Sequence, residues 1–246
     1  MYLEEAEDEP YDPLFLPLSK CEPKLRGRGF LRRMGDVLRF PWLSNKSPED
    51  VEALHQRLLP SFAGRCVENN DYLSLQEILK HMDIDDRDYD GNTAMHRACE
   101  IGNTSMVLQL LGLGATYQIT NRFGYTPLHL AIKNKHYDTI KFLIQHGATV
   151  TQHPVRMAMD LIKAVRAKDY RLVYAWHLAG TDMNQRDYNG QTALHVAVEK
   201  RNELMVSKLL QCGASPEIAD IWGRTAASEA RKNNLHDILV LFNLPI

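Results

Sequence analysis

Three short stretches of the chain spell almost the same word: residues 91–98 read GNTAMHRA, residues 124–131 read GYTPLHLA and residues 190–197 read GQTALHVA. Their first glycines are separated by one and then by two periods of about 33 residues. A second series of glycines keeps the same period, at Gly114, Gly147, Gly180 and Gly213. A fixed period of this length is typical of proteins built from stacked units, each of which buries its apolar face against its neighbours. We therefore expect a stack of similar units.

The word GYTPLHLA predicts the start of a helix. The hydroxyl of Thr126 can accept a hydrogen bond from a free amide of the first turn, and Pro127 suits the first helical position, where no donor is needed. A second helix is predicted over residues 137–146 and ends at Gly147, because glycine adopts a left-handed terminal conformation at little cost. Small residues recur on the first helices, where close packing requires them: Ala98, Ala131, Ala164, Ala197 and Ala230.

With its period of about 33 residues and the word T-P-L-H-x-A, the chain resembles the ankyrin-repeat family. The resemblance implies an all-α solenoid of about five to six helix-turn-helix repeats with hairpin loops. We expect a largely disordered arm at 1–45, an N-terminal capping helix at 46–61 and repeats over 62–246. The repeats are a partial one at 64–86, two regular ones at 87–119 and 120–152, a degenerate one at 153–184, a regular one at 185–218 and a cap at 219–246.

The histidines of the words share one position in the repeat: His96, His129 and His195. Taken singly they look like metal ligands or bases. Their common phase favours a structural role instead, because ankyrin repeats use this histidine to bond the threonine and the neighbouring loop. No ligand spacing such as H-E-x-x-H occurs, and we expect no metal and no cofactor.

Two repeats depart from the pattern. In the degenerate repeat, Met159, Asp160, Leu161 and Ile162 stand where Thr-Pro-Leu-His belongs, and Met157 stands in place of the loop glycine. In the last repeat Ser228 replaces the histidine, and charged residues interrupt the apolar face. A terminal repeat needs such a polar outer face because nothing covers it.

Composition excludes several classes of protein. Twenty-nine basic against 31 acidic residues give a net charge of −2, which argues against a nucleic-acid binder held mainly by charge. No run reaches the roughly 18 apolar residues of a membrane span, and the acidic N-terminus is unlike a signal peptide. Four scattered cysteines, Cys21, Cys66, Cys99 and Cys212, favour reduced thiols in a cytoplasmic protein.

The N-terminal arm changes character along its length. Residues 1–12 carry several aspartates and glutamates and no base, and such a stretch is expected to be disordered. Residues 24–40, KLRGRGFLRRMGDVLRF, form a basic amphipathic stretch that can lie on an anionic membrane or in a partner groove. We favour the alternative that it docks back on the first repeat or joins something upstream. A helix is predicted over 47–59, with Ser47 as its N-cap.

One family shares this order of features. The stretch PWLSNKSPEDVEALHQRLLPSFAGRCVENNDYLSLQEIL and the degenerate repeat with its aromatic pair, Tyr174 and Trp176, resemble the C-terminal region of the animal-type cytoplasmic L-asparaginase/lysophospholipase family. The resemblance covers about residues 41–246. It implies a catalytic domain outside this chain, because that family's T-G-G-T and G-T-D-T words are both incomplete here. Gly180-Thr181-Asp182 is a fragment of the second word, but Met183 follows, and the glycine is in phase with the repeats.

These observations predict a non-catalytic protein-protein interaction module. The alternative is the C-terminal part of a cytoplasmic L-asparaginase, which converts asparagine to aspartate and ammonia. The expected partner is another protein, an asparaginase catalytic domain among the candidates, and not a nucleic acid; membrane contact through residues 24–40 is the weakest option. Solenoids bind through hairpin tips and first helices. The candidate tip residues are Asp88, Tyr89, Asp90, Arg122, Phe123, Tyr188, Asn189 and Trp222, and the candidate helix residues are Arg97, Leu130, Lys163, Val196 and Glu229. Ordinary hairpin packing is the alternative role for each tip residue.

Overall fold

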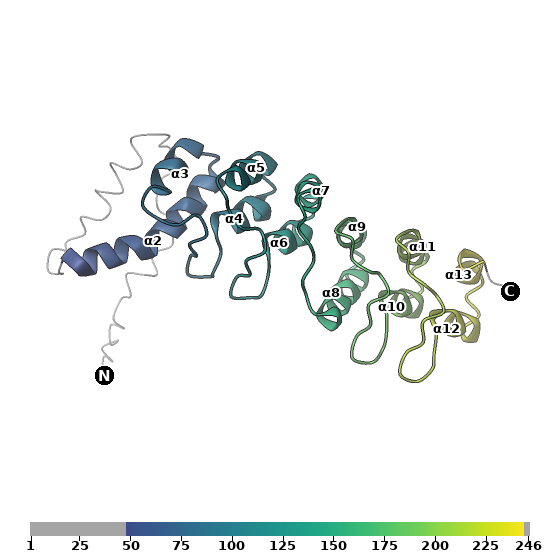
Figure 1. Ribbon diagram of the computed structural model, residues 1–246. Helices are drawn as coiled ribbons and strands as arrows, with labels where there is room; N and C mark the ends of the chain where they lie inside the picture. Colours follow the sequence, from purple (N-terminus) through teal and green to yellow (C-terminus); the bar gives the residue numbers. More distant parts are fainter. Residues whose placement is uncertain (1–47, 244–246) are drawn as a thin grey trace, which may run out of the picture. The chain divides into compact units, whose positions relative to one another are not determined.

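The structure is a computed structural model that describes residues 48–243, with side chains from residue 57 (Figure 1). The chain divides into two units between residues 46 and 47. The arm at 1–45, the basic stretch 24–40 and the proposed cap Ser47 lie outside the described residues, so the predictions made for them stay predictions. Everything below concerns the second unit.

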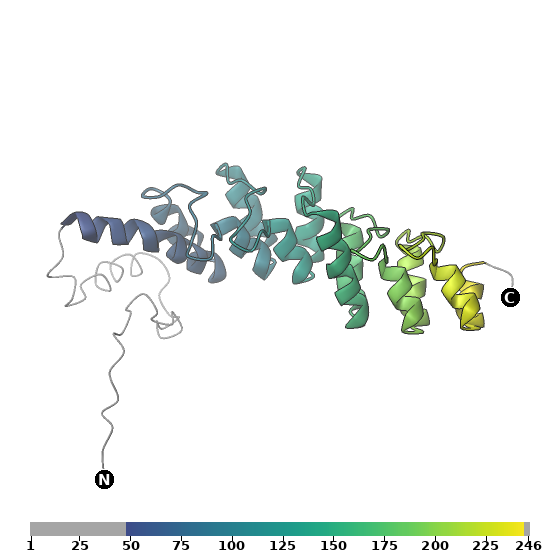
Figure 2. The same ribbon diagram turned by 90° about the horizontal axis from the view of Figure 1, so that it is seen from below.

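The described residues form twelve α-helices and no extended strand, with one isolated bridge between Ala219 and Thr225. The predicted all-α stack is thereby confirmed. Helices alternate along the chain as first and second members of pairs (Figures 1 and 2). The first helices are α2 (Pro48–Glu68), α4 (Ala94–Ile101), α6 (Pro127–Lys133), α8 (Pro154–Arg166), α10 (Ala193–Glu199) and α12 (Ala226–Lys232). The second helices are α3 (Tyr72–Ile78), α5 (Thr104–Gly112), α7 (Tyr137–Gln145), α9 (Tyr170–Leu178), α11 (Glu203–Gln211) and α13 (His236–Leu241).

Helix starts follow the predicted chemistry. The Thr126 hydroxyl accepts from the amide of His129 at 3.3 Å and caps α6, with Pro127 at the first helical position. Four second helices, α3, α5, α9 and α11, begin after an Asp or Asn cap: the Asn103 side chain, for example, accepts from the amide of Met106 at 3.0 Å. The small alanines predicted to allow close packing are all buried: Ala98, Ala131, Ala164, Ala197 and Ala230.

The turn between the helices of each pair holds one left-handed residue. Most such residues are not glycine: Asn70, Lys135, Lys168, Arg201 and Asn234. Gly102, at φ +75°, is the exception. A Cβ atom there would overlap the ring of His136, which is fixed because His136 Nε2 lies 2.8 Å from the carbonyl oxygen of Glu100. Close approach of the next repeat therefore requires glycine at this one turn.

Helix α2 is longer than predicted. It runs unbroken from Pro48 to Glu68 with Pro60 inside it, so the expected cap at 46–61 and the first helix of the opening repeat are one element. A proline removes one helical hydrogen bond and usually ends or kinks a helix. Here Leu59, Ala63 and Val67 are buried and α2 packs on α3 and α4. Burial of this face on both sides of Pro60 outweighs the lost bond.

The stack is interrupted before α8. Hairpin loops precede α4, α6, α10 and α12, but none precedes α8 (Figure 1). Met157, expected in place of a loop glycine, lies inside α8 and is buried, so that loop prediction was wrong. First helices otherwise pack in sequence, α2 on α4, α4 on α6, α8 on α10 and α10 on α12, whereas α6 packs on α9. The loss of the hairpin thus coincides with a break in first-helix packing.

Second helices bridge this break. Helix α7 packs on α9, and Lys135 Nζ lies 2.6 Å from Asp169 Oδ2. The Tyr137 hydroxyl donates to the carbonyl of Arg171 at 3.2 Å, and its ring meets that of Tyr174 edge-on at 5.4 Å. The two sides of the break are therefore joined through the second helices.

Candidate functional site

The four hairpin tips share one construction. The first residue of each tip is Asp88, Asn121, Asp187 or Asp220, and its side-chain oxygen accepts from two backbone amides two and four residues further on. At Asp88 these bonds are 2.9 and 2.7 Å long, from the amides of Asp90 and Asn92. The side chain thus closes the turn in the manner of an Asx-turn. Asp88 therefore has a structural role, which was the alternative left open for the tip residues.

Adjacent tips are tied by backbone hydrogen bonds. The amide of Arg122 donates to the carbonyl of Asp90 at 3.0 Å, and the amide of Ile221 donates to the carbonyl of Asn189 at 3.1 Å. The Asn121 side chain also donates to that of Asn92 at 2.9 Å. These bonds join the tips within each pair of neighbours into a continuous surface.

Large aromatic side chains project from every tip. The exposed fractions are 72% for Tyr89, 56% for Phe123, 80% for Tyr188 and 59% for Trp222. Two of them carry a stacked guanidinium: Arg122 lies 4.4 Å from the centre of the Tyr89 ring, and Arg224 lies 4.6 Å from that of Trp222. Such stacking holds an exposed ring in place. The predicted aromatic side chains are therefore exposed at all four hairpin tips of the described residues.

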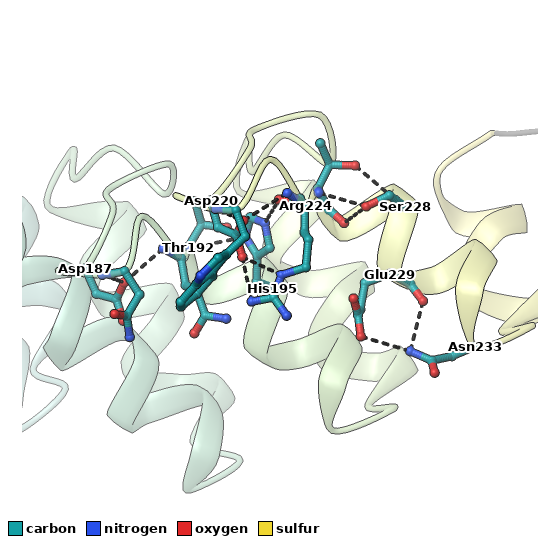
Figure 3. A network of polar contacts seen from close by, with 12 residues as sticks. Asp187, Thr192, His195, Asp220, Arg224, Ser228, Glu229 and Asn233 are labelled. Carbon is teal, nitrogen blue, oxygen red and sulfur yellow. Dashed lines mark hydrogen bonds and ion pairs between the residues drawn. The ribbon is translucent and has the colours of Figure 1, made fainter.

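Two of the three histidines in the repeated motif, His96 and His195, link neighbouring repeats as predicted, and Figure 3 shows His195. His195 Nδ1 lies 2.9 Å from the Thr192 hydroxyl, and its Nε2 lies 3.1 Å from the carbonyl of Arg224 in the next repeat. His96 repeats the arrangement with Thr93 at 3.0 Å and the Tyr125 carbonyl at 3.0 Å. Burial lowers the pKa of His96, so its neutral form predominates at neutral pH.

His129 is the exception among the three. Its Nδ1 is buried without a hydrogen-bond partner, and the repeat that follows has no hairpin to supply a carbonyl to its Nε2. The ring instead stacks on Tyr125 at 4.4 Å and meets Trp176 edge-on at 5.1 Å. Burial lowers its pKa to about 4. A small recess beside it is lined by Gly124, Thr126, Leu128, Val150, Thr151 and Gln152.

The last repeat replaces its histidine link with local bonds. The Ser228 hydroxyl accepts from the amide of Thr225 at 2.8 Å and donates to the carbonyl of the same residue at 2.8 Å (Figure 3). Asp220 holds Arg224 by an ion pair of 2.8 Å. Serine reaches only its own repeat, which suits a position at the end of the described stack.

Two of the residues predicted to bind a partner are buried and cannot contact one. Leu130 is 6% exposed and Val196 is 1% exposed, so assigning them to the binding surface was wrong. The reason is that α6 lies against α4 and α9, while α10 lies between α8 and α12. Arg97 is partly exposed but is held by Glu100 at 2.9 Å. Of the helix positions, Lys163 is exposed and Glu229 is partly exposed.

The side chains that could bind a metal or react as nucleophiles lie apart or are buried in the described residues. Among them no three His, Cys, Asp or Glu side chains gather as a metal site. Thr181, in the fragment Gly180-Thr181-Asp182, is buried in the turn after α9, and Gly180 has the left-handed backbone of the other repeat glycines. Cys66 and Cys99 are buried and free, and burial raises the pKa of Cys66 to about 12. Between residues 48 and 243, no helix is long and apolar enough to span a membrane.

Residues 64–153 and 161–243 match the family model for ankyrin repeats (3 copies). The chain belongs to the ankyrin-repeat family. The residues between the two matches, 154–160, are the first half of α8, where the hairpin is missing. Among solved structures, the ankyrin repeat domain of Bcl-3 is similar at a TM-score of 0.58 and 22% identity, over 77% of this chain and 92% of that one. An ankyrin repeat domain from Acinetobacter baumannii is similar at 0.57 and 25%, over 74% and 95%.

Curated relatives are longer than this ankyrin-repeat chain. An L-asparaginase of Dirofilaria immitis is 30% identical over 92% of this chain, which spans 37% of that protein. The human B-cell lymphoma 3 protein is 33% identical over 60% of this chain, which spans 34% of that protein. The resemblance of this region to the asparaginase family is thereby supported, and the ankyrin-repeat relatives identify the chain as a protein-interaction module.

Proposed function

We propose that the chain binds a partner protein in the cytoplasm through its row of hairpin tips, with Tyr89, Phe123, Tyr188 and Trp222 as anchors. The observation that carries the proposal is the regular exposure of one large aromatic ring per tip. Rings of this kind supply most of the binding energy at protein interfaces. Stacking by Arg122 and Arg224 restricts two of them before binding, which lowers the entropy lost on association.

The second helices present a different set of exposed side chains. The exposed large apolar side chains on the second helices are Leu73, Leu108, Tyr174, Leu204, Val240 and Leu241. All but one are aliphatic, and the single aromatic, Tyr174, has its ring against that of Tyr137 at 5.4 Å. Leu73, Leu108, Leu204 and Val240 are therefore the four aliphatic positions of this back face used as the control. This back face therefore provides a matched control for the tips.

The test compares two fourfold variants of the full chain. One changes the four tip aromatics to alanine, and the other changes the four back-face residues to alanine. Cross-linking in cells followed by mass spectrometry identifies the partner of the unchanged chain, and purified partner is then titrated against each variant. We expect the tip variant to lose binding at least about 100-fold and the back-face variant to keep it. Retained binding by a folded tip variant rejects the surface.

A second candidate function is supported by the asparaginase relative, which is similar over 92% of this chain. In that case the chain associates with a catalytic domain that lies outside it and does not itself hydrolyse asparagine. Titration of the chain against an asparaginase catalytic domain, with activity followed as ammonia release, tests the association. Ammonia release by the purified chain alone contradicts the non-catalytic assignment.

A further inference from the structure

One hairpin is missing from an otherwise regular row. The amide of Arg122 donates to the carbonyl of Asp90. A shift by one repeat period moves this pair to Val155 and Phe123. Val155 lies in the first turn of α8, and its amide is 3.3 Å from His153 Nδ1 instead. The tip at Phe123 therefore has no neighbouring hairpin on the side of α8.

The two hairpins beside this gap have lost their backbone partners. The carbonyl of Phe123 accepts from the side chain of Arg156 at 3.0 Å, which stands in for the missing amide. On the other side, Tyr188 holds the place that Arg122 and Ile221 hold in their repeats. Its amide makes no hydrogen bond within residues 48–243, because the carbonyl that would accept it belongs to Arg156 inside α8. This hairpin therefore presents one unbonded backbone amide, that of Tyr188, on the side of the gap.

The exposed side of α8 next to the gap is basic. Besides Pro154, the exposed side chains of α8 are Arg156, Met159, Lys163 and Arg166, a spacing that places these four on one stripe of the helix, with Arg156 at the end that contacts Phe123. No acidic side chain of the described region lies within ion-pair distance of either arginine. Lys163 reaches only Asp160 of its own helix, at 3.1 Å.

Two arginines elsewhere in the row of repeats are paired with acids. Arg97 meets Asp88 and Glu100, and Arg224 meets Asp220. Other arginines, such as Arg122, lie over an aromatic ring instead. Beside the gap, Lys133 and Arg156 both lie over the ring of Tyr125, at 5.5 and 5.1 Å. On α8, therefore, Lys163 is paired with Asp160, whereas Arg156 and Arg166 have no acidic side chain within ion-pair distance among the described residues.

We propose that the gap is a docking site for an extended, acidic segment of the partner protein. The proposal rests on the proposed function and assigns the chemistry of the segment that the tips receive. The segment's carbonyl accepts from the amide of Tyr188, as the tip of a neighbouring repeat does elsewhere. Its carboxylates pair with Arg156, Lys163 and Arg166. Addition of a strand to an open backbone edge is a common mode of peptide recognition, and the charge of α8 selects acidic over basic sequences.

A labelled probe peptide tests the charge preference. The probe is a short fluorescein-tagged peptide that alternates glutamate and valine, and its control alternates lysine and valine. Fluorescence anisotropy with the full chain follows binding at two salt concentrations. We expect saturable binding of the acidic peptide that weakens with salt, and at least tenfold weaker binding of the basic one. Equal affinity for the two peptides, or no binding of the acidic one, overturns the proposal.

The open edge is tested at Tyr188. The amide of Gly190 donates to the carbonyl of Asp187 at 3.0 Å, so Tyr188 is the second residue of a turn, a position that accepts proline. Tyr188→Pro removes the amide hydrogen together with the aromatic ring, and Tyr188→Ala removes the ring alone. We expect Tyr188→Pro to bind the acidic peptide about fivefold more weakly than Tyr188→Ala. Equal affinity of the two variants, with unchanged circular dichroism, rejects the backbone pairing.

The basic stripe is tested by charge reversal. Arg156→Glu with Lys163→Glu is compared with Lys141→Glu and Lys208→Glu, which make the same change on exposed positions of α7 and α11. Only the first pair is expected to abolish binding of the acidic peptide. If both double variants bind the acidic peptide as tightly as the unchanged chain, the proposed site is rejected. The acidic peptide can fail to bind while the fourfold tip variant still loses the partner protein. In that case the proposed function of the tips is kept and only the acidic-segment site is rejected.

Discussion

The Nε2 atom of His195 lies 3.1 Å from the carbonyl oxygen of Arg224, one repeat further along the chain. The same ring also meets Thr192 at the start of its own helix. One buried side chain therefore fixes both a helix start and the position of the next hairpin. His129 has the same place in its repeat and neither of these bonds.

Replacement of these two histidines by leucine should have unequal effects. His195→Leu leaves the Thr192 amide and the Arg224 carbonyl without their partner, and the loss of buried hydrogen bonds costs about 1–3 kcal/mol. His129→Leu removes a buried ring without polar partners and should change the free energy of unfolding by less than about 1 kcal/mol. Urea unfolding followed by circular dichroism measures both. Equal destabilisation contradicts the unequal roles of the two residues.

The glycine of the second repeat turn should not tolerate a side chain. Gly102→Ala forces a Cβ atom into the ring of His136 at a left-handed backbone position, and we expect a loss of about 2 kcal/mol or more. The matched change is Asn234→Gly, which replaces an asparagine in the left-handed conformation with the residue best suited to that conformation. It should be neutral or slightly stabilising. A mild effect of Gly102→Ala in thermal unfolding shows that His136 can move aside.

Acid should weaken the fold through His129. Its pKa in the folded chain is lowered to about 4 by burial, whereas an unfolded histidine titrates near 6.5. Between these values the unfolded chain binds the extra proton, so stability falls as the pH drops from about 6.5 towards 4. His129→Leu should reduce the slope of unfolding free energy against pH in this window. An unchanged slope assigns the acid sensitivity to other groups, such as His96.

The buried thiols should react slowly. Burial raises the pKa of Cys66 to about 12, and Cys99 is fully buried with its pKa also raised, so thiolate is scarce at neutral pH. Cys212 is partly exposed. Alkylation with iodoacetamide and peptide mass spectrometry should label Cys212 first and the other two only in denaturant. Rapid labelling of Cys99 in the native chain shows local opening of α4.

The repeat word predicts most of the fold. Thr126 caps its helix, Pro127 occupies the first helical position and His195 bonds the next repeat, as their chemistry implies. These roles can be predicted because each depends on near neighbours in sequence or on the same position of the next repeat. The absence of the T-P-L-H motif at 159–162 marks the degenerate repeat. It does not show that α8 extends through the place of the hairpin, because a missing motif does not specify what replaces it.

For the candidate binding surface, the sequence predicts the exposed tip aromatics correctly but not the helix positions. Exposure of the tip aromatics follows from their place at the turn, which is fixed by the period. Leu130 and Val196 were misplaced because the period gives the phase of a residue but not which helices cover it. The basic stripe on α8 was not predicted from the sequence. Its signal was the spacing of Arg156, Lys163 and Arg166, which becomes visible only once residues 154–166 are known to be one helix.

The displaced packing of α6 onto α9 has a consequence for how the stack comes apart. In repeat proteins stability is roughly a sum of units and of contacts between nearest neighbours, so cooperativity fails where the weakest contact lies. The junction before α8 has no backbone bond between hairpins, and α6 has its main contact there with α9 in place of the next first helix. We therefore expect two melting segments that meet at Trp176, whose fluorescence should change before the helical signal of the whole chain is lost.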